Sequence, residues 1–339
     1  MGRGRVLGTR IFVCEYVTGG GFSATALPVG LRREGDVMLR GLLGHLARLD
    51  GLDIVISRDA RLAAADLPAQ VVPIAAAQDP WSVWAGMIAA ADMVWPIAPE
   101  TNGLLERLSA MVLAAHRRLI GSTPAAVRLC TSKFATAAHL SAHAIPVVPT
   151  RRLMDWQAGM IPPTSGRLVI KPDDGAGAED CFLIAPPDTP ADFLRNQASP
   201  ARFVVQPYVT GAAASLCLLC REGEARMLSC NQQLVALAHG QFRCHGWIVG
   251  GMERYRARYE PIAQGIAAAI PGLAGYVGVD LVDGADGPLV LEVNPRLTTS
   301  YAGLAASLKA NPAAWVLSVC QGETWPDMPL PRLPYHLRV

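Results

Sequence analysis

The sequence predicts an α/β fold for the N-terminal third of the chain, followed by lobes that mix strands and helices less regularly. In the first third, apolar strand-like segments alternate with helix-like segments, a pattern typical of a doubly wound and mostly parallel sheet. In the remainder, strand–loop–strand segments with glycine and proline in their loops predominate. The chain has 339 residues, and single hydrophobic cores stop growing at about 250 to 300 residues. Two or three packed units are therefore expected.

Each element follows from an apolar run and the loop that ends it. In the first third, the expected strands are 10–17, 53–57, 93–98 and 118–120, and the expected helices are 36–49, 81–91 and 104–117. Further on, helices are expected after 121–124, at 131–144 and at 300–309, and strands at 167–171, 181–184, 203–207 and 213–220. The proline-rich tail from 325 to 339 is expected to run over the surface.

Two loops at expected strand ends are candidates for contact with a substrate, because ligands of such sheets bind beyond the carboxyl ends of the strands. One contains Gly19, Gly20 and Gly21, and the other contains Glu100. The triple glycine lacks the spaced G-x-G-x-x-G pattern and the immediately following helix of a dinucleotide site. A substrate-side loop is therefore favoured over nicotinamide binding. A plain tight turn explains these glycines equally well.

Composition narrows the class of protein and of partner. The formal net charge is +2, so no overall field favours nucleic acid or an acidic membrane, whereas small anionic ligands remain compatible. No segment approaches 18 uninterrupted apolar residues, which predicts a soluble, cytoplasmic protein without membrane contact. The eight cysteines are scattered through apolar segments and are expected to be buried free thiols. Cys217 and Cys220 would point to opposite faces of a strand, so a zinc site there is not expected.

Near the C-terminus, two apolar runs joined by a Gly/Asp/Pro loop predict a β-hairpin. If the loop spans 284–288, Asp283 faces Leu289 and Asp280 faces Glu292. Directly opposed side chains lie about 4.5 to 5.5 Å apart, and like charges at that distance are destabilising unless a cation lies between them.

A divalent metal is the simplest cation to meet this need. Period-two alternation puts Asn294 on the same face as Glu292, so Asp280, Glu292 and Asn294 offer hard oxygen ligands. Such ligands suit Mg²⁺ that is completed by water and nucleotide phosphates. Arg296 follows two residues later, where it can meet an anion. The alternative is a solvent-facing hairpin with incidental acids.

Lys133 lies in the first turn of an expected helix, where a cation opposes the helix dipole. An anionic ligand would offset that unfavourable position. The alternative is a lysine whose head group simply reaches solvent.

A glycine-rich loop follows the strand that ends at Lys171. Gly175 and Gly177 would let backbone N–H groups approach phosphate oxygens, and Lys171 would supply a point charge. The loop also carries acids that must point outward, cap the turn or meet a metal: Asp173, Asp174, Glu179 and Asp180. A hairpin without a ligand is the alternative, and the loop is no Walker motif.

A proline interrupts the chain after the strand at 203–207. Pro207 cannot donate to a sheet ladder, so the chain is expected to leave its sheet near Tyr208. The segment formed by Gln206, Pro207, Tyr208 and Val209 can then offer backbone groups to the edge of an adenine ring. The alternative is an ordinary linker between two lobes.

Taken together and in this order, these motifs resemble the ATP-grasp superfamily over about residues 10–321. The resemblance implies an N-terminal Rossmann-like domain (1–120), a central lid lobe (121–205), a C-terminal α+β lobe with the magnesium site (206–325) and a proline-rich tail (326–339). It implies binding of ATP with Mg²⁺ or Mn²⁺ between the two α+β lobes.

The resemblance also implies a role for each motif. Lys133 and Lys171 match the phosphate-binding lysines, and Gly175 and Gly177 match the flexible lid. Gln206, Pro207, Tyr208 and Val209 match the adenine hinge, while Asp280, Glu292 and Asn294 match the magnesium ligands. Arg296 matches the arginine that steadies the transferred phosphoryl group, which makes Arg296 and Lys171 the expected catalytic residues.

Two positions depart from the family pattern. Ala212, Ala213 and Ala214 stand where many members carry an acid for the ribose hydroxyls. Glu179 and Asp180 replace glycines at the end of the lid loop.

More narrowly, segments 14–21 and 94–101 are similar to the branch that includes tyramine–glutamate ligase of methanofuran biosynthesis. This similarity implies a carboxylate–amine ligase that acts through an acyl phosphate. It would join glutamate to tyramine or tyrosine for a methanofuran- or methylofuran-type cofactor of one-carbon metabolism. The expected partners are a small carboxylic acid and an amine, and a homodimer is the default assembly. The alternatives are a catalytically decayed ATP-binding regulatory protein and a small-molecule kinase.

Overall fold

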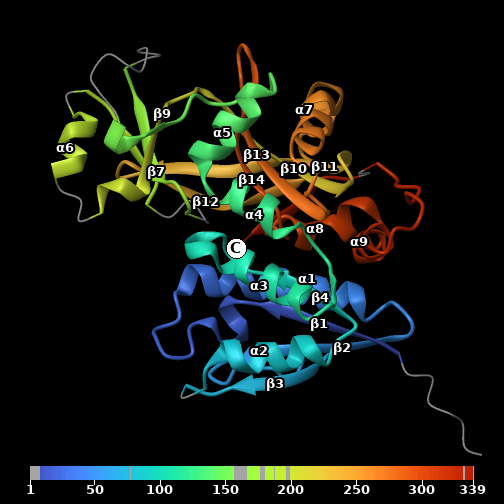
Figure 1. The fold of residues 1–339 in the computed structure, drawn as a ribbon. Helices are drawn as coiled ribbons and strands as arrows, with labels where there is room; N and C mark the ends of the chain where they lie inside the picture. Colours follow the sequence, from blue (N-terminus) through green and yellow to red (C-terminus); the bar gives the residue numbers. More distant parts are fainter. Residues whose placement is uncertain are drawn as a thin grey trace, which may run out of the picture.

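Two β-sheets form the framework of the protein in the computed structural model (Figure 1). The first contains the N-terminal strands, and the second contains the strands of the rest of the chain. The structure describes residues 8–76, 78–155, 166–175, 180–186, 188–195, 199–330 and 333–338.

The N-terminal sheet is entirely parallel and has the strand order β3-β2-β1-β4-β5. Its strands are β1 (Thr9–Glu15), β2 (Leu52–Asp59), β3 (Gln70–Ile74), β4 (Met93–Ile97) and β5 (Arg118–Leu119). Helix α1 (Val29–Leu46) packs on the face that carries Ile11 and Val13, whereas α2 (Pro80–Ala89) and α3 (Leu104–Ala114) pack on the face of Phe12 and Cys14. The expected doubly wound architecture is confirmed, and its switch point lies between β1 and β4.

Two details of this domain differ from the sequence-based expectation. Helix α1 begins at Val29 rather than near Asp36, although Gly30 and Gly35 weaken its helical signal. Gly35 is required by packing, because a Cβ there would lie 2.8 Å from a carboxylate oxygen of Glu15. Strand β3 was not expected, since Pro73 interrupts its apolar run. The proline is tolerated because β3 is an edge strand.

In the described part of the chain, the second sheet is ten-stranded, with the order β14-β13-β10-β11-β12-β8-β7-β9-β6 and with β15 paired to β12. The strands β6 to β9 are Arg151–Arg152, Leu168–Pro172, Phe182–Ile184 and Phe203–Pro207. The strands β10 to β15 are Gly211–Arg221, Glu224–Ala238, Gln241–Val249, Gly275–Gly284, Gly287–Asn294 and Tyr335–Arg338. Its helices are α4 (Pro124–Thr131), α5 (Lys133–Ala142), α6 (Pro190–Arg195), α7 (Arg256–Ala269), α8 (Tyr301–Leu308) and α9 (Pro312–Cys320).

Alternating residues of β10 contribute to two different cores. Leu216 and Leu218 pack with α4, α5 and α7, so the helices at 124–142 share the core of the C-terminal strands. The strands at 151–207 have a separate small core formed by Leu153, Ile170, Phe203 and Val205. The join between these two parts of the sheet is narrow in the described part of the chain, because β8 pairs with β12 at one position there, Gln241 with Phe182.

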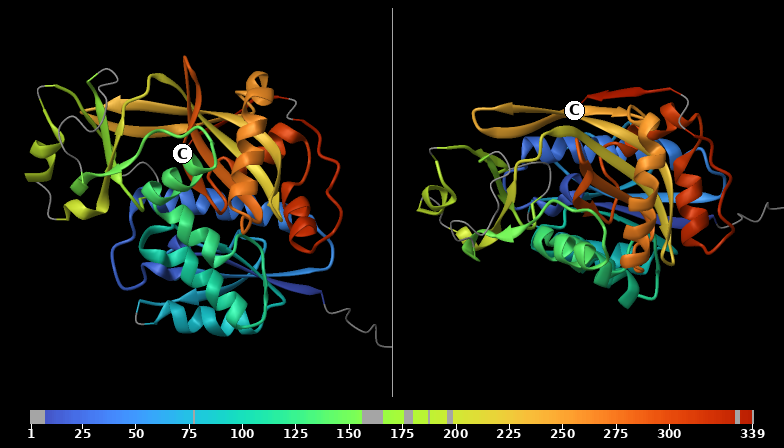
Figure 2. Two further views of the ribbon diagram at one scale, coloured as in Figure 1. Left: turned by 45° about the horizontal axis from the view of Figure 1, so that its top comes forward. Right: turned by 90° about the horizontal axis from the view of Figure 1, so that it is seen from above.

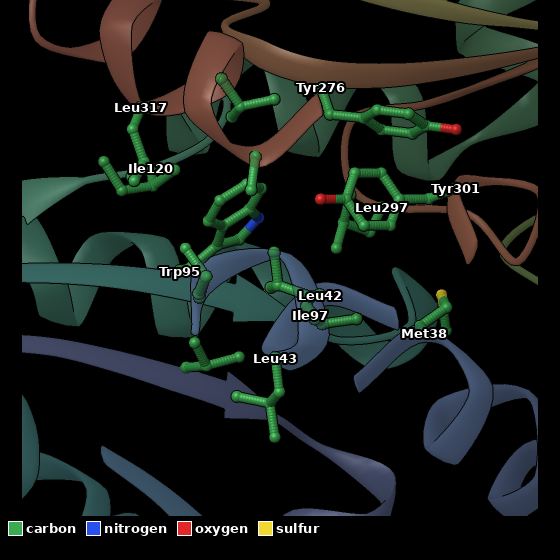
Figure 3. Packing of buried hydrophobic residues seen from close by; sticks show 14 of the residues in the cluster. Met38, Leu42, Leu43, Trp95, Ile97, Ile120, Tyr276, Leu297, Tyr301 and Leu317 are labelled. Atoms are coloured by element: carbon green, nitrogen blue, oxygen red, sulfur yellow. The ribbon is translucent and has the colours of Figure 1, made fainter. Parts of the chain in front are cut away.

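The opposite face of β10 packs against the N-terminal domain. Leu42 and Leu43 of α1 meet Tyr276 of β13, Leu297 and Tyr301 in one continuous buried cluster (Figure 3). All five side chains are at most 2% exposed. This shared core fixes the N-terminal domain against the C-terminal lobe.

The C-terminal tail was expected to run over the surface, but its end joins the second sheet. Residues Tyr335–Arg338 form β15, which pairs antiparallel with Gly246–Val249 of β12 (Figure 2). Ser307 of α8 also donates a hydrogen bond to the carbonyl of Leu333. This short strand was not predicted, because the prolines earlier in the tail are typical of irregular segments.

His45 makes the interface between α1 and α8 sensitive to acid. Its Nδ1 lies 3.1 Å from the hydroxyl oxygen of Tyr301, and burial lowers the pKa of His45 from 6.5 to about 4. Between these two values the unfolded chain binds more protons than the folded protein. The free energy of unfolding should therefore fall as pH drops from about 6.5 to about 4, which urea titrations at several pH values can measure.

The variant His45→Phe should have a shallower pH dependence over that range. The matched control is His245→Phe, at an exposed position of β12, which should keep the wild-type slope. Equal slopes for all three proteins would contradict this assignment.

Candidate active site

A cavity of about 570 Å³ lies between the N-terminal domain and the second sheet. Most of the residues singled out in the sequence line it: Lys133, Lys171, Gly175, Gln206, Pro207, Tyr208, Val209, Asp280, Glu292, Asn294 and Arg296. Gly19, Gly20, Gly21 and Glu100 do not line it. Gly177 lies outside the described residues.

A β-bulge brings the two carboxylates of the C-terminal hairpin face to face. The turn is tighter than expected, since Gly284 pairs with Gly287 and Asp283 faces Pro288 rather than Leu289. The register then shifts by one residue beside Leu281, so that Asp280 is opposite Glu292 as expected.

The same shift decides which side chains of β14 reach the cavity. Val290 and Val293 both pack in the core beneath the sheet. Glu292 and Asn294 line the cavity on the other side.

Amide groups hold Asp280 in place. Its two oxygens accept hydrogen bonds from Gln233 Nε2 at 2.7 Å and from Asn294 Nδ2 at 3.2 Å. Burial raises the pKa of Asp280 well above its usual range, and the charge of Glu292 adds to this effect. In the absence of a metal, the pair therefore favours a single negative charge.

Two lysines have the opposite effect on Glu292. Lys133 Nζ lies 3.2 Å from Glu292 Oε2, and the Lys133 side chain is 7% exposed. Burial alone would raise the pKa of Glu292, but Lys133 and Lys171 outweigh it and hold that pKa below its ordinary value. Burial lowers the pKa of Lys171 itself, while Glu292 acts in the opposite sense. The carboxylate pair and the lysine pair thus form one cluster, in which the charges of each pair offset those of the other.

Asp173 explains why Lys133 is tolerated at the start of α5. Its carboxylate accepts from the backbone N–H of Phe134 at 2.8 Å and from the Ser132 hydroxyl at 2.7 Å. A carboxylate at this helix end is electrostatically favourable. The anion that was expected to come from a ligand is therefore supplied in part by the protein itself. Lys133 Nζ in turn donates to the Gly175 carbonyl at 2.7 Å, which ties the loop after β7 to the hairpin.

The expected hinge leaves the sheet where the proline predicts. Strand β9 ends at Pro207, and β10 begins at Gly211. The Gln206 side chain is 2% exposed and donates to the Thr150 hydroxyl at 2.8 Å, so it holds the strand in place. The Tyr208 ring stacks on Phe242, with 6.2 Å between the ring centroids. The segment at 206–209 thus forms an apolar end of the cavity, and these contacts hold it in place.

Arg296 meets an acid of the N-terminal domain at the other end of the cavity. Its Nη2 donates to Glu100 Oε2 at 2.8 Å, and the two side chains are 11% and 8% exposed. Glu100 was proposed to contact a substrate, but in the structure its side chain is engaged by this arginine.

The glycines after β1 are explained by close packing. Gly20 has φ 109°, and a Cβ on Gly19, Gly20 or Gly21 would lie within 3 Å of Ser57, Ile74 or Tyr16 respectively. The tight-turn alternative therefore accounts for them. Glu15 and Val17 are the residues of this region that line the cavity, and the Glu15 carboxylate accepts from the backbone N–H groups of Val17 and Thr18. Burial raises the pKa of Glu15.

Several cavity residues were missed in the sequence. They come from α1 and from β11 and β12: Leu31, Glu34, Met38, Gln233, Cys244 and Trp247. No local motif marks them, because each reaches the cavity only through the packing of α1 and β12 against the hairpin. Leu31, Glu34 and Met38 share one face of α1 by their helical spacing, but that spacing alone does not show that this face meets a cavity.

The donor set fits Mg²⁺. Asp280 and Glu292 provide facing carboxylates, and the amide oxygen of Asn294 is the atom with which that residue would bind a metal. Burial and then the facing charge of Glu292 raise the pKa of Asp280, and a bound cation would offset both effects. No cluster of three or more His, Cys, Asp or Glu side chains occurs within the described ranges, so a thiolate- or imidazole-rich metal site is not present there.

Two family models match consecutive segments of the chain. Residues 130–300 match an ATP-grasp domain, and residues 52–127 match a pre ATP-grasp 3 domain. The first match covers just over half of the chain. No helix in the part of the chain that the structure describes is long and apolar enough to cross a membrane.

Two similar proteins carry the name tyramine–L-glutamate ligase. The chain is 25% identical to the ligase from Methanocaldococcus jannaschii over 225 residues, which are 66% of this chain and 60% of that protein. It is 25% identical to that of Methanocaldococcus fervens over 300 residues, which are 87% of this chain and 89% of that protein. The match to the first therefore spans less than two thirds of that relative.

Solved structures share the fold. An L-amino acid ligase from Bacillus licheniformis superposes with a TM-score of 0.68 at 16% identity, covering 92% of this chain and 74% of that one. N5-carboxyaminoimidazole synthetase from Staphylococcus aureus, complexed with ADP, superposes with a TM-score of 0.71 at 14% identity, covering 97% and 81%.

The variant Glu292→Gln tests the carboxylate pair, because it keeps the shape of the side chain and removes one charge. We expect binding of ADP with Mg²⁺ to weaken at least about tenfold and turnover to fall at least about a hundredfold. ADP binding without Mg²⁺ should not weaken, since the lysines lose an anionic competitor. Calorimetry with and without Mg²⁺ measures both effects.

Glu224→Gln is the matched control, because this glutamate is exposed at the start of β11. It should leave both titrations unchanged. Near-normal Mg²⁺-dependent binding by Glu292→Gln would overturn the metal assignment.

Proposed function

The chain belongs to the ATP-grasp family, and we propose that it is an ATP-dependent ligase that joins a carboxylate to an amine. One observation carries the proposal. A single cavity is lined by the Asp280–Glu292 pair, by Lys133 and Lys171, and by Arg296. These groups match the charges of a nucleotide triphosphate and of a second anion beside it.

The proposed reaction has two steps. An oxygen of the substrate carboxylate attacks the γ-phosphorus of ATP, ADP leaves, and an acyl phosphate forms. The amine nitrogen then attacks the acyl carbon, inorganic phosphate leaves, and the nitrogen loses a proton. In such reactions the protein mainly positions the reactants and neutralises charge.

Charge neutralisation is the main demand on the side chains. Two anions 4 Å apart repel by roughly 4 kcal/mol at an effective dielectric constant of 20. Lys133 and Lys171 would hold the nucleotide phosphates, and Arg296 would steady the transferred phosphoryl group. Asp280, Glu292 and Asn294 would hold Mg²⁺, whose positive charge would lower this repulsion further.

The end of the cavity beside the N-terminal domain has features that suit an aromatic amine. Glu15 and Glu34 contribute carboxyl groups, whereas Leu31, Met38 and Trp247 contribute apolar surface. An ammonium group favours such acids, and a planar ring favours the indole. Both relatives named above join tyramine to glutamate. This supports glutamate as the acid and tyramine or tyrosine as the amine, with a methanofuran- or methylofuran-type cofactor as the destination.

A panel of acids and amines assayed for ADP release tests the proposed function, with glutamate, tyramine and tyrosine tried first. Hydroxylamine should trap a hydroxamate from the acid alone, because only an acyl phosphate yields that product. ADP release without a hydroxamate would indicate a small-molecule kinase instead.

Ala212, Ala213 and Ala214 favour a second candidate, an ATP-binding regulatory protein without catalysis. They follow the hinge where many family members carry a ribose-binding acid. Calorimetric binding of ATP together with no ADP release from any pair of substrates would support this candidate and contradict a ligase.

Trp247→Ala should raise the KM for the amine about tenfold or more, with the KM for ATP changed less than about twofold. The physical reason is the loss of the indole surface on which the amine's ring would rest. Steady-state kinetics with each substrate varied in turn measures this split.

Trp325→Ala is the matched control. This tryptophan packs beneath Arg221 and Arg226 and does not line the cavity. Equal effects of the two substitutions on the amine's KM would contradict the placement of the amine.

A further inference from the structure

We propose that the turn Glu100–Gly103, which follows β4, is a positioning element that aligns Arg296 with the base of the glycine loop. The turn lies outside the cavity lining, so it acts through the residues that it holds. Its kinetic consequences rest on the ligase function proposed above, whereas its contacts can be tested without turnover.

The first contact holds Arg296 from across the domain boundary. Arg296 Nη2 donates to Glu100 Oε2 at 2.8 Å, and Arg296 Nη1 donates to the carbonyl of Leu297 at 3.0 Å. Together these bonds fix the plane of the guanidinium group. Arg296 Nε has no hydrogen-bond partner within the described ranges, although it is buried. The hydrogen bonds of Nη1 and Nη2 thus orient the guanidinium group, and Nε is left to donate to an anion.

Glu100 is dedicated to this contact. Its side chain is 8% exposed, and its Oε1 has no hydrogen-bond partner in the part of the chain described. A buried carboxylate with an unsatisfied oxygen is costly unless a paired cation stabilises it. Arg296 is the cation that Glu100 meets, so the two side chains depend on each other.

The second contact holds the loop after β7. The Thr101 hydroxyl donates to the carbonyl of Asp174 at 2.8 Å, and the Asn102 N–H donates to Asp174 Oδ2 at 3.2 Å. Asp174 directly precedes Gly175, whose carbonyl accepts from Lys133. One short turn therefore contacts both Arg296 and the loop whose Gly175 carbonyl accepts from Lys133.

The backbone of this turn has an uncommon conformation. Asn102 has φ 56° and Gly103 has φ 68°, two successive residues in the left-handed region. Asparagine and glycine adopt that region more readily than other residues, so these two positions suit the turn. The turn carries Glu100, which meets Arg296, and the Asn102 N–H, which meets Asp174.

Two variants of the turn should have different kinetic signatures. Glu100→Gln should lower kcat about tenfold or more with little change in the KM for ATP, because it loosens Arg296. Thr101→Val should raise the KM for ATP about threefold or more with little change in kcat, because it loosens the loop at Gly175. Equal changes in both parameters for both variants would indicate general destabilisation and overturn the proposal.

A double-mutant cycle tests whether Glu100 acts through Arg296. Arg296→Lys combined with Glu100→Gln should be no worse than Arg296→Lys alone, within about twofold in kcat. Multiplicative losses would show that Glu100 acts independently and would overturn the proposal. Glu106→Gln is the matched control, since Glu106 lies on the neighbouring helix α3 and its partner Arg128, on α4, is 73% exposed. It should retain wild-type kinetics.

A measurement without turnover separates this proposal from the ligase function. Phenylglyoxal modifies arginines, and mass spectrometry can follow Arg296 in the full chain with ADP and Mg²⁺ bound. Glu100→Gln should increase the labelling rate of Arg296 about fivefold, while Glu106→Gln should not. Unchanged labelling would overturn the pairing even if the enzyme is active. Increased labelling in a protein that turns over no substrate would instead refute only the ligase function.

Discussion

Two carboxyl groups, those of Asp280 and Glu292, face each other across a hairpin, and the repulsion that would arise if both were ionised governs the rest of the cavity. Isolated in a buried setting, the two carboxylates would hold a proton between them. Lys133 and Lys171 draw Glu292 back toward its ionised form, and Asp173 offsets the charge of Lys133 at the start of α5. The cluster is therefore poised for a divalent cation and for phosphates, each of which relieves an imbalance that the protein maintains.

Holding such a cluster in register requires rigid support, which comes from the core shared by α1, β13 and α8. The N-terminal domain is attached to the C-terminal lobe through this core, so the carboxyl ends of β1 and β4 are held beside the hairpin. Glu15 and Glu100 come from those ends, and one reaches the cavity while the other reaches Arg296. The doubly wound sheet thus contributes to the site at its switch point, where such sheets bind ligands.

The elements with strong periodicity could be predicted from the sequence, and so could the residues carried by short motifs. The predicted pairing of Asp280 with Glu292 is confirmed, but the loop from which it was predicted is wrong. A loop over 284–288 was assumed, whereas the tight turn and the bulge beside Leu281 together give the same pairing. The role of Glu100 could not be predicted, because its partner is Arg296, distant in sequence. Trp247 and Glu34 were missed for the same physical reason, since only tertiary packing brings them to the cavity. Strand β15 was hidden by the prolines that precede it.

The narrow join between β8 and β12 has a mechanical consequence. Among the described residues, one ladder pair connects the strands at 151–207 to the rest of the sheet there. Two backbone hydrogen bonds flank it, from Leu183 to Gly240 and from Phe242 to Cys181. The wide ladders between β10, β11 and β13 resist bending, whereas this seam resists it least. The sheet would therefore bend most easily at this seam, and the Asp280–Glu292 pair lies on the wide-ladder side of it.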